Sequence, residues 1–324
     1  MKKYWYPIAL QKEIKKDPKS FFLLGEKIVV YRGSHGLVAQ KDSCPHRKYP
    51  LSEGKVVDGE IQCGYHGWKF DNKGFQSDLP GSGKQLNSKC SILQTYSIHE
   101  HEHLIWICLQ ENVPFTPFHK DLLPRKIFSH KTTIPGDPKD ILENFLDPLH
   151  TSFLHNGIIR SQKKRNKTIA EIRSIKNGVE VKYTEVSPQT GIIGSIMGRF
   201  ITHSYGRLTK PNVIDLEFHS KKGIVMTNRF IIVPTHKNEN FFFSQLTFRK
   251  TWIPSQLKMG ILAPLFYLAL QQDKKALKIQ LMNMVPEEHK EYNSTYLDIM
   301  RPYIDQMQMD KELKVVEKDI NLFL

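Results

Sequence analysis

Short apolar runs that alternate with polar residues dominate the first 110 residues of the chain. The run FFLLGEKIVVYRGSHGLVAQ at 21–40 consists of β-branched or aromatic stretches separated by glycine-containing turns, and SILQTYSI at 91–98 and HLIWICL at 103–109 repeat this pattern. Such alternation, with glycine at the breaks, is typical of short strands. We therefore predict an all-β domain over residues 1–120, which ends in a proline-containing linker near 112–126.

The second half of the chain mixes helical and strand-like patterns. Asp137 is a candidate N-cap followed by Pro138, which predicts a helix over 138–155. We expect another helix from Pro264 to about Met284 and a final charged helix over roughly 296–319. Four strand-like runs lie between the first two helices: VEVKYTEV, VIDLEF, IVMTNRFIIV and FFFSQLTF. These elements predict an α+β domain over 121–324, with an antiparallel sheet and flanking helices.

Composition and charge narrow the class of protein only a little. A content of 40% hydrophobic and 25% charged residues is that of an ordinary globular protein. The net charge of +14 suggests nucleic acid, but the positive residues are spread along the chain and no nucleic-acid motif accompanies them. The one dense basic run, RSQKKRNK at 160–167, is either a solvated loop or a docking site for an acidic partner or anionic substrate. We expect no nucleic-acid partner.

The sequence also shows neither the pattern of a membrane span nor that of a secretory signal. The longest apolar run, ILAPLFYLAL at 261–270, is about half of the roughly 20 residues that span a membrane. The first residues, MKKYWYPIALQKE, contain no apolar h-region of a secretory signal, and there are four cysteines in all. We therefore expect a cytoplasmic protein with no membrane span and no disulfides.

Two short loops of the β-rich half carry candidate metal ligands. CPH at 44–46 and CGYH at 63–66 supply Cys44, His46, Cys63 and His66, with sixteen residues between the loops. A structural zinc site uses the same residue types, but it usually pairs cysteine with cysteine in one loop and histidine with histidine in the other. One cysteine and one histidine in each loop suit a two-iron cluster, in which one iron takes both thiolates and the other takes both imidazoles.

This motif resembles the Rieske [2Fe–2S] signature, and WYPIAL at 5–10 resembles the opening of Rieske oxygenases. The resemblance covers most of the chain and is weak between Lys163 and Gly260. It implies an all-β Rieske iron–sulfur domain followed by a helix-grip-like α+β catalytic domain. Three residues depart from the family pattern, Gly64 in place of a proline and Lys48 and Tyr49 in place of small residues. None of them is a ligand, so they bear on redox potential and docking rather than on the cluster.

The remaining cysteines do not extend the motif. Respiratory Rieske proteins carry an extra cysteine in each loop, which together form a disulfide, and neither loop has one here. Their absence favours the oxygenase or ferredoxin branch of the family. We interpret Cys90 as a loop residue and Cys108 as a strand residue rather than as ligands.

A second candidate site is NFLDPLHTSFLH at 144–155, which contains Asp147, His150 and His155. Asp147 and His150 are three apart and share a helix face, whereas His150 and His155 would be about 140° apart around an ideal helix. The two histidines can meet at one metal only if the helix is distorted or ends between them, and residues 151–153 are weak helix formers. The pattern resembles the mononuclear iron motif of Rieske oxygenase α subunits, in which two histidines and one carboxylate leave positions open for O₂ and substrate.

The third ligand could be Asp147 or a distal acid. In the family it comes from a late helix with the pattern D-x-x-x-L-x-x-Q, which Asp273, Leu277 and Gln280 match. Independently, Asp273 lies on an otherwise apolar stripe of its predicted helix, where an acid should not be buried unpaired. The alternative is an acid tolerated near the helix surface beside two lysines. Weaker candidates in polar surroundings are Glu287, Asp298 and Asp305.

If Asp273 is the ligand, Asp147 is free for another role. The resemblance implies a head-to-tail homotrimer, in which the cluster of one subunit serves the iron of its neighbour. By position, Asp147 would accept N–H bonds from His66 of one subunit and His150 of the next, as an inter-subunit electron relay. Asn144 either helps to position this site or lies on the helix surface.

We expect a terminal oxygenase of a multicomponent Rieske non-haem iron system, similar to the α-only vanillate O-demethylase-like group. Electrons from NAD(P)H would pass through a reductase, with or without a ferredoxin, to the [2Fe–2S] cluster and then to mononuclear Fe(II). O₂ would hydroxylate or oxidatively demethylate a small apolar or aromatic substrate, and ligand spacing does not distinguish these from desaturation or dihydroxylation. A Rieske-type electron carrier and a zinc-stabilised binding module are the alternatives. Aromatic residues that could line a pocket or belong to the core are Phe145, Phe153, Phe200 and Phe266.

Overall fold

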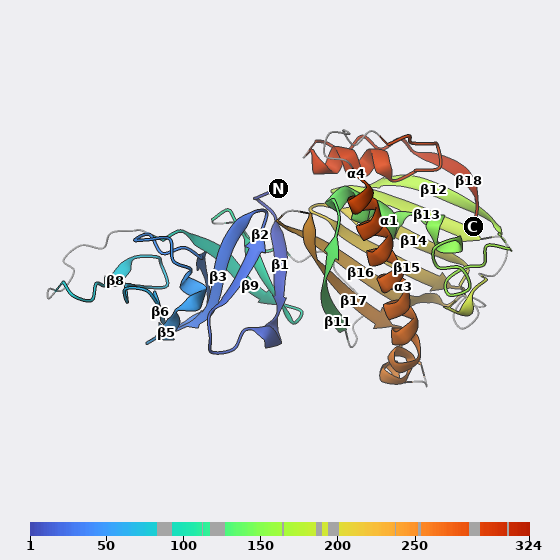
Figure 1. The fold of residues 1–324 in the computed structure, drawn as a ribbon. Coiled ribbons are helices and arrows are strands. Elements are labelled where there is room, and N and C mark those ends of the chain that lie inside the picture. Colours follow the sequence, from blue (N-terminus) through green and yellow to red (C-terminus); the bar gives the residue numbers. More distant parts are fainter. Residues whose placement is uncertain are drawn as a thin grey trace. The chain divides into compact units, whose positions relative to one another are not determined.

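The computed structural model describes two compact units of the chain (Figure 1). The first comprises Met1–Phe118 with Val233–Lys237, and the second comprises His119–Ile232 with Asn238–Leu324. The residues described are 1–82, 93–111, 113–116, 127–163, 165–185, 190–193, 201–236, 238–251, 254–284, 292–309 and 311–324. The linker predicted at 112–126, Cys90 and Phe200 lie wholly or largely outside them.

The first unit is built from short antiparallel strands, blue to cyan in Figure 1, as the alternating pattern predicts. Its six-stranded sheet has the order β1-β10-β9-β4-β3-β2, and its four-stranded sheet has the order β5-β6-β7-β8. The bounds are β1 Trp5–Leu10, β2 Lys19–Leu23, β3 Glu26–Gly33, β4 Gly36–Lys41, β5 Lys55–Val57, β6 Glu60–Gln62, β7 Lys69–Phe70, β8 Gln76–Asp78, β9 Thr95–His101 and β10 Leu104–Cys108, with short 3₁₀ turns η1 Gln11–Glu13 and η2 Leu51–Glu53. Cys108 ends the fully buried strand β10, as predicted.

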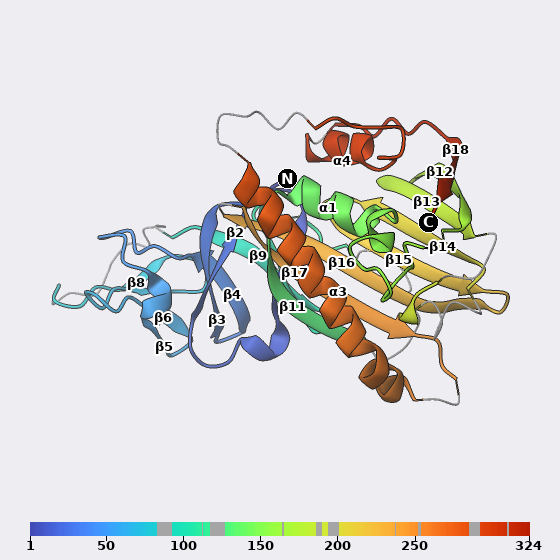
Figure 2. The ribbon, with the colours of Figure 1, turned by 45° about the vertical axis from the view of Figure 1, so that its right-hand side comes forward.

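The second unit is one eight-stranded antiparallel sheet with helices on one face (Figures 1 and 2). The strand order is β11-β17-β16-β15-β14-β13-β12-β18. The bounds are β11 Phe128–Pro135, α1 Pro138–Leu146, η3 His150–Ser152, β12 Lys167–Ile175, β13 Gly178–Glu185, β14 His203–Thr209, β15 Val213–Ser220, β16 Gly223–His236, β17 Glu239–Phe248, α3 Ser255–Asn283, α4 Arg301–Gln308 and β18 Lys318–Phe323. This α+β architecture confirms the predicted fold class.

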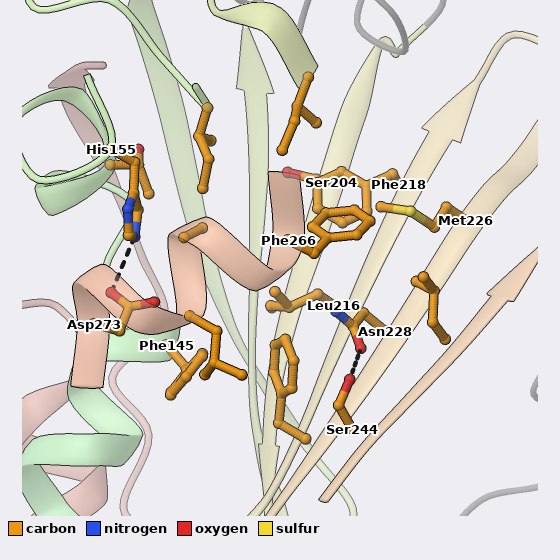
Figure 3. Close-up of a pocket in the computed structure, with 18 of the residues that line it drawn as sticks. Phe145, His155, Ser204, Leu216, Phe218, Met226, Asn228, Ser244, Phe266 and Asp273 are labelled. Atoms are coloured by element: carbon orange, nitrogen blue, oxygen red, sulfur yellow. Dashed lines mark hydrogen bonds and ion pairs between the residues drawn. The ribbon is translucent and has the colours of Figure 1, made fainter. Parts of the chain in front are cut away.

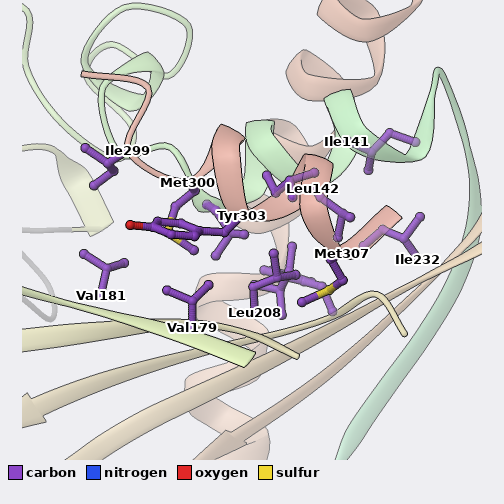
Figure 4. Packing of buried hydrophobic residues seen from close by; sticks show 14 of the residues in the cluster. Ile141, Leu142, Val179, Val181, Leu208, Ile232, Ile299, Met300, Tyr303 and Met307 are labelled. Carbon is purple, nitrogen blue, oxygen red and sulfur yellow. The ribbon is translucent and has the colours of Figure 1, made fainter. Parts of the chain in front are cut away.

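The main core of the second unit lies between its helices and the sheet (Figure 4). Helix α1 contributes Ile141 and Leu142, and α4 contributes Tyr303 and Met307, each at most 4% exposed. They pack against sheet residues such as Val179, Val181 and Leu208. Removing these apolar side chains from water is the main contribution to the stability of the folded unit, at about 25 cal/mol for each Å² of apolar surface buried.

Helix α1 is shorter than the helix predicted over 138–155. It has the expected cap, because the Asp137 side chain accepts a hydrogen bond from the Lys139 N–H at 3.0 Å, but it ends at Leu146. The reason is Pro148, since a residue that precedes proline is driven out of the helical region. Asp147 accordingly has φ −82° and ψ 117°. The predicted break at 151–153 was therefore placed too late.

Two further predictions of helix bounds were wrong. Helix α3 begins at Ser255, not at Pro264, because the good helix formers before Pro264 continue the helix across it at the loss of one hydrogen bond. The last helix occupies only Arg301–Gln308, and Lys318–Phe323 forms strand β18, which pairs with β12 at the edge of the sheet.

In the part of the chain that the structure describes, no helix has the length and apolarity that a membrane crossing requires.

Candidate metal centres

Two loops of the same construction bring the cysteines and histidines of the first unit together. In the loop after β4 the Cys44 N–H donates to the Tyr49 carbonyl at 2.8 Å, and the Lys48 N–H donates to the Cys44 carbonyl at 2.8 Å. In the loop between β6 and β7 the Cys63 N–H donates to the Trp68 carbonyl at 2.8 Å, and the Gly67 N–H donates to the Cys63 carbonyl at 3.0 Å. The equivalent positions Lys48 and Gly67 have φ of 61° and 75°. This left-handed conformation explains why a small residue is usual where Lys48 stands.

The four candidate ligands converge at the tips of these loops. The Cys44 and Cys63 thiols are buried and contact each other, and the rings of His46 and His66 lie 4.7 Å apart. Burial, followed by the neighbouring Cys63 thiol, raises the pKa of Cys44, so a pair of thiolates here needs a cation to balance its charge. Burial, together with His66 and Arg47, lowers the pKa of His46, which favours the neutral imidazole that binds metals. The donor set therefore fits a two-iron cluster.

Packing explains the departure from the family pattern at Gly64. A Cβ atom at this position would lie 2.8 Å from the backbone carbonyl oxygen of Glu53 and 3.4 Å from the Tyr49 ring. The proline that is usual here would therefore require the turn around Glu53 to move. Trp68 covers the other side of the site, with its ring stacked on His46 at 4.6 Å.

In the second unit the break at Pro148 sets the positions of the second group of ligands. Because Asp147 is extended, its carboxylate turns back and accepts hydrogen bonds from the N–H groups of Leu149 at 2.8 Å and His150 at 3.1 Å. These bonds start the 3₁₀ turn η3, which begins at His150. A tight turn followed by a bend brings His155 beside His150, with their ring centroids 5.1 Å apart. A straight helix could not have placed the two rings together.

Asp273 of α3 completes this group. Its Oδ1 atom lies 3.0 Å from Nε2 of His155 and 3.7 Å from Nε2 of His150. Ligand atoms bound side by side to a metal at about 2.1 Å are about 3 Å apart, so the three atoms suit one small cation. Asp273 is 5% exposed and His155 is 1% exposed. Their ligand atoms all lie within 4.8 Å of one another, close enough to bind one metal ion.

A residue that the sequence did not indicate supports His155. Nδ1 of His155 lies 2.8 Å from Oε1 of Gln272, the neighbour of Asp273 on α3. Burial disfavours protonation of His155, but the hydrogen bond and charge of Asp273 and the bond to Gln272 outweigh it and raise the pKa of His155. An oxygen that accepts from Nδ1 leaves Nε2 free to bind a metal, which is the usual arrangement around metal-bound histidine.

The three side chains border a large cavity between the helices and the sheet (Figure 3). Its volume is about 670 Å³, and most of the side chains that line it are apolar. Phe145 and Phe266 line it, as was considered from sequence, whereas Phe153 is 54% exposed. Asp147 and His150 also line a separate hollow of about 220 Å³ between α1 and α3, together with Asn144. These two residues therefore stand between the cavity and the second hollow.

Comparison with known proteins identifies the first unit. A family model described as the Rieske [2Fe-2S] domain matches residues 4–97, which include both loops. The structure of Pseudomonas putida NdmA with caffeine covers 94% of this chain and 89% of its own, with a TM-score of 0.78 and 20% identity. The chain has the fold of a Rieske oxygenase α subunit. The Rieske domain decides against the zinc alternative for the first site.

Curated relatives match about half of the chain. Protein TIC 55 of Arabidopsis thaliana is 32% identical over 163 residues, which are 47% of this chain and 30% of that protein. The 3-chlorobenzoate-3,4-dioxygenase oxygenase subunit of Comamonas testosteroni is 28% identical over 206 residues, 58% of this chain and 43% of that protein. The chain thus spans less than half the length of these curated relatives.

Proposed function

We propose that the chain is the terminal oxygenase of a Rieske non-haem iron system and not an electron carrier alone. The observation that carries this proposal is the convergence of His150, His155 and Asp273 at the wall of a 670 Å³ cavity, in a chain that also has a Rieske domain. An electron carrier has no use for such a cavity. Relatives whose names describe a dioxygenase, a demethylase and a monooxygenase support the same function.

The Rieske cluster would be held by Cys44, His46, Cys63 and His66, and a mononuclear iron by the histidines and Asp273 of the second unit. Bound there, the iron with its open positions supplies the activation of O₂. One oxygen atom enters a C–H bond of the substrate and the other leaves as water, with the electron pair coming from NAD(P)H. Hydroxylation at an N- or O-methyl carbon gives an unstable product that loses formaldehyde, so both reactions need the same site.

The protein's own residues orient the ligands and exclude water. Asp147 is fixed by two backbone N–H groups, and its Oδ2 atom is 3.6 Å from Nδ1 of His150. Gln272 holds His155. Phe145 lies over the cavity against Phe230 and Phe242, at ring distances of 4.9 and 4.8 Å, and keeps that side apolar. An apolar lining lowers the local dielectric constant, so the charge of the Asp273 carboxylate would act more strongly there than in water.

Asp147 is proposed as the electron relay between subunits. His66 is exposed on its loop, and the Asp147 side chain is 30% exposed at the second hollow, so both are accessible to a neighbouring copy. We accordingly propose a homotrimer in which His66 of one copy meets Asp147 of the next. A reductase, with or without a ferredoxin, is the proposed electron donor, and the cytoplasm is the proposed location.

Substitutions of the two acids, Asp273 and Asp147, test the proposal. Asp273→Ala removes a ligand and should lose the mononuclear iron while the visible absorption of the cluster stays. Asp147→Asn should keep both metals, yet slow oxidation of the reduced cluster by O₂ and substrate by at least about tenfold. Iron and sulfide per chain and stopped-flow absorption measure the two effects. If Asp147→Asn empties the iron site and Asp273→Ala does not, the two roles are reversed, and if the wild type contains only cluster iron, the protein is an electron carrier.

A further inference from the structure

A polar pair interrupts the apolar wall that the sheet presents to the cavity. Asn228 of β16 pairs across the sheet with Leu216 of β15, which in turn pairs with Gly206 of β14. Residues that pair directly across an antiparallel sheet point to the same face, so this row faces the cavity. Ser244 of β17 extends the row, because its hydroxyl donates to Oδ1 of Asn228 at 3.1 Å. Both members of the pair line the cavity (Figure 3).

On β15 and β16 the neighbouring pairs on either side of Asn228 and Leu216 are apolar. On one side Phe218 pairs with Met226, and on the other Ile214 pairs with Phe230. Phe230 also stacks on Phe242 at 5.3 Å. Figure 3 shows Asn228 and Ser244 on the sheet, across the cavity from His155 and Asp273 on the helical side. A molecule that fills the cavity therefore meets this polar pair on the sheet side, away from the proposed metal ligands.

The hydrogen-bonding capacity of the pair is only partly used. The Asn228 carbonyl oxygen is occupied by Ser244, whereas no hydrogen bond within the described residues engages its Nδ2 group. A side-chain amide has two N–H donors on that nitrogen. A donor that loses water on ligand binding and gains no acceptor costs about 1–3 kcal/mol. The amide therefore favours a ligand that carries an acceptor at this end.

The charges around the cavity argue against an anionic ligand. The guanidinium in its lining, Arg160, is already paired with Glu185 at 2.7 Å, and both side chains are 8% exposed. Burial, followed by the nearby Lys274, lowers the pKa of His130, which keeps this cavity residue neutral near pH 7. The lining also includes the carboxylates of Asp147 and Asp273. At the sheet end of the cavity, away from the proposed iron, a buried substrate carboxylate would thus find no unpaired cation among the described lining residues, and burying an unpaired charge is very costly.

We propose that the cavity selects a neutral, largely apolar substrate with a carbonyl or ether oxygen, which accepts a hydrogen bond from Nδ2 of Asn228. Ser244 holds the amide so that this nitrogen faces the cavity. The oxygen anchors one end of the substrate, and the carbon that reacts lies at the other end, toward His155 and Asp273. This inference names the substrate class of the proposed oxygenase and so depends on that function.

Three bicyclic probes of similar shape test the proposal in the holoenzyme by binding calorimetry. They are 2-acetylnaphthalene with a carbonyl, 2-ethylnaphthalene without one, and 2-naphthoate with a charge. A cavity of about 670 Å³ is large enough for each of them. The wild type should bind the ketone about 2–12-fold more tightly than the hydrocarbon, the range expected of one neutral hydrogen bond, and more tightly than the naphthoate.

Asn228→Leu should abolish this preference, so that ketone and hydrocarbon bind within about twofold of each other. Its affinity for 2-ethylnaphthalene should equal or exceed that of the wild type, which shows that the variant is folded. Ser204→Ala removes a cavity hydroxyl in the Phe218 row and should leave the preference unchanged.

Four results would overturn the substrate class: no preference of the wild type for the ketone over the hydrocarbon, a preference that survives Asn228→Leu, naphthoate binding more tightly than the ketone, or no binding of either neutral probe up to its solubility. Iron and sulfide are measured in the same samples. A full complement of metals with no preference overturns the substrate class alone, whereas a wild type that lacks the mononuclear iron overturns the proposed function.

Discussion

Gln272 shows how much a single side chain adds to a site whose ligands were already expected. Its Oε1 atom accepts from Nδ1 of His155 and so holds Nε2 toward Asp273. It lies next to Asp273, on the other side from Lys274, and carries no motif of its own. The glutamine that the family pattern singled out, Gln280, instead donates to the Tyr292 hydroxyl at 3.2 Å. The two glutamines of α3 therefore differ in role.

Gln272→Leu should lower the affinity for mononuclear iron by about 10–100-fold, because the ring of His155 loses the acceptor that fixes its tautomer. Titration of the iron-depleted protein with Fe(II) against a competing chelator measures this affinity. Gln272→Glu keeps the acceptor and should restore most of the binding. Gln280→Leu is the matched control, and an equal loss of iron affinity in that variant would contradict the role given to Gln272.

At the scale of the element, helices α1 and α4 are joined by a buried ion cluster. Nη1 of Arg301 on α4 lies 3.0 Å from Asp140 and 2.7 Å from Glu143, both on α1. The Arg301 and Asp140 side chains are 10% and 6% exposed. Removing the cation leaves two carboxylates in a poorly solvated place, and this costs more than the pair itself contributes. The cluster fixes α1, the helix that leads into Asp147 and His150.

Arg301→Leu should therefore lower the free energy of unfolding by about 3–5 kcal/mol. Urea denaturation followed by circular dichroism measures this change. Lys139→Ala provides the comparison, because Lys139 joins the same two helices through a more exposed ion pair with Asp305 at 3.0 Å, with side-chain exposures of 30% and 37%. The free energy of unfolding of the Lys139→Ala variant should fall by at most about 1 kcal/mol. Similar losses in the two variants would mean that burial of the cluster does not matter.

The elements also show why parts of the fold were predictable and others were not. The ligands of the Rieske loops are close in sequence, so Cys44 and His46 could be recognised together. The end of α1 was predicted wrongly, because the cap at Asp137 indicates only where the helix begins and the effect of Pro148 on the residue before it was not considered. Strand β18 was missed because it is charged and exists only through its pairing with β12. Asn228 and Ser244 come together only across two strands.

At the scale of the whole molecule, the two compact units have separate hydrophobic cores. Cys44 and Cys63 belong to a core cluster of the first unit, with Tyr31 and Phe70 among its members. The core in Figure 4 belongs to the second unit. Units with their own cores need not unfold together, so a single melting temperature is not expected to describe the chain.

Scanning calorimetry of the holoenzyme should show two transitions. Cys63→Ser removes a cluster ligand, and because bound metal stabilises the folded state, it should lower one transition and leave the other unchanged. Cys108→Ser alters an equally buried cysteine of the same unit and should keep the visible absorption of the cluster. A single transition that shifts as a whole in Cys63→Ser would show that the two units unfold as one.

The division of the cavity between helices and sheet has a consequence for evolution. The proposed metal ligands and Gln272 come from η3, the bend after it and α3, whereas the polar pair and its apolar neighbours come from alternate positions of β14 to β17. Mutations on the strands should therefore change which substrate is bound while the proposed metal ligands stay intact. Descendants of this sequence that act on new compounds should have diverged first at positions 216, 228 and 244, and laboratory libraries confined to these strands should yield altered specificity with full iron content.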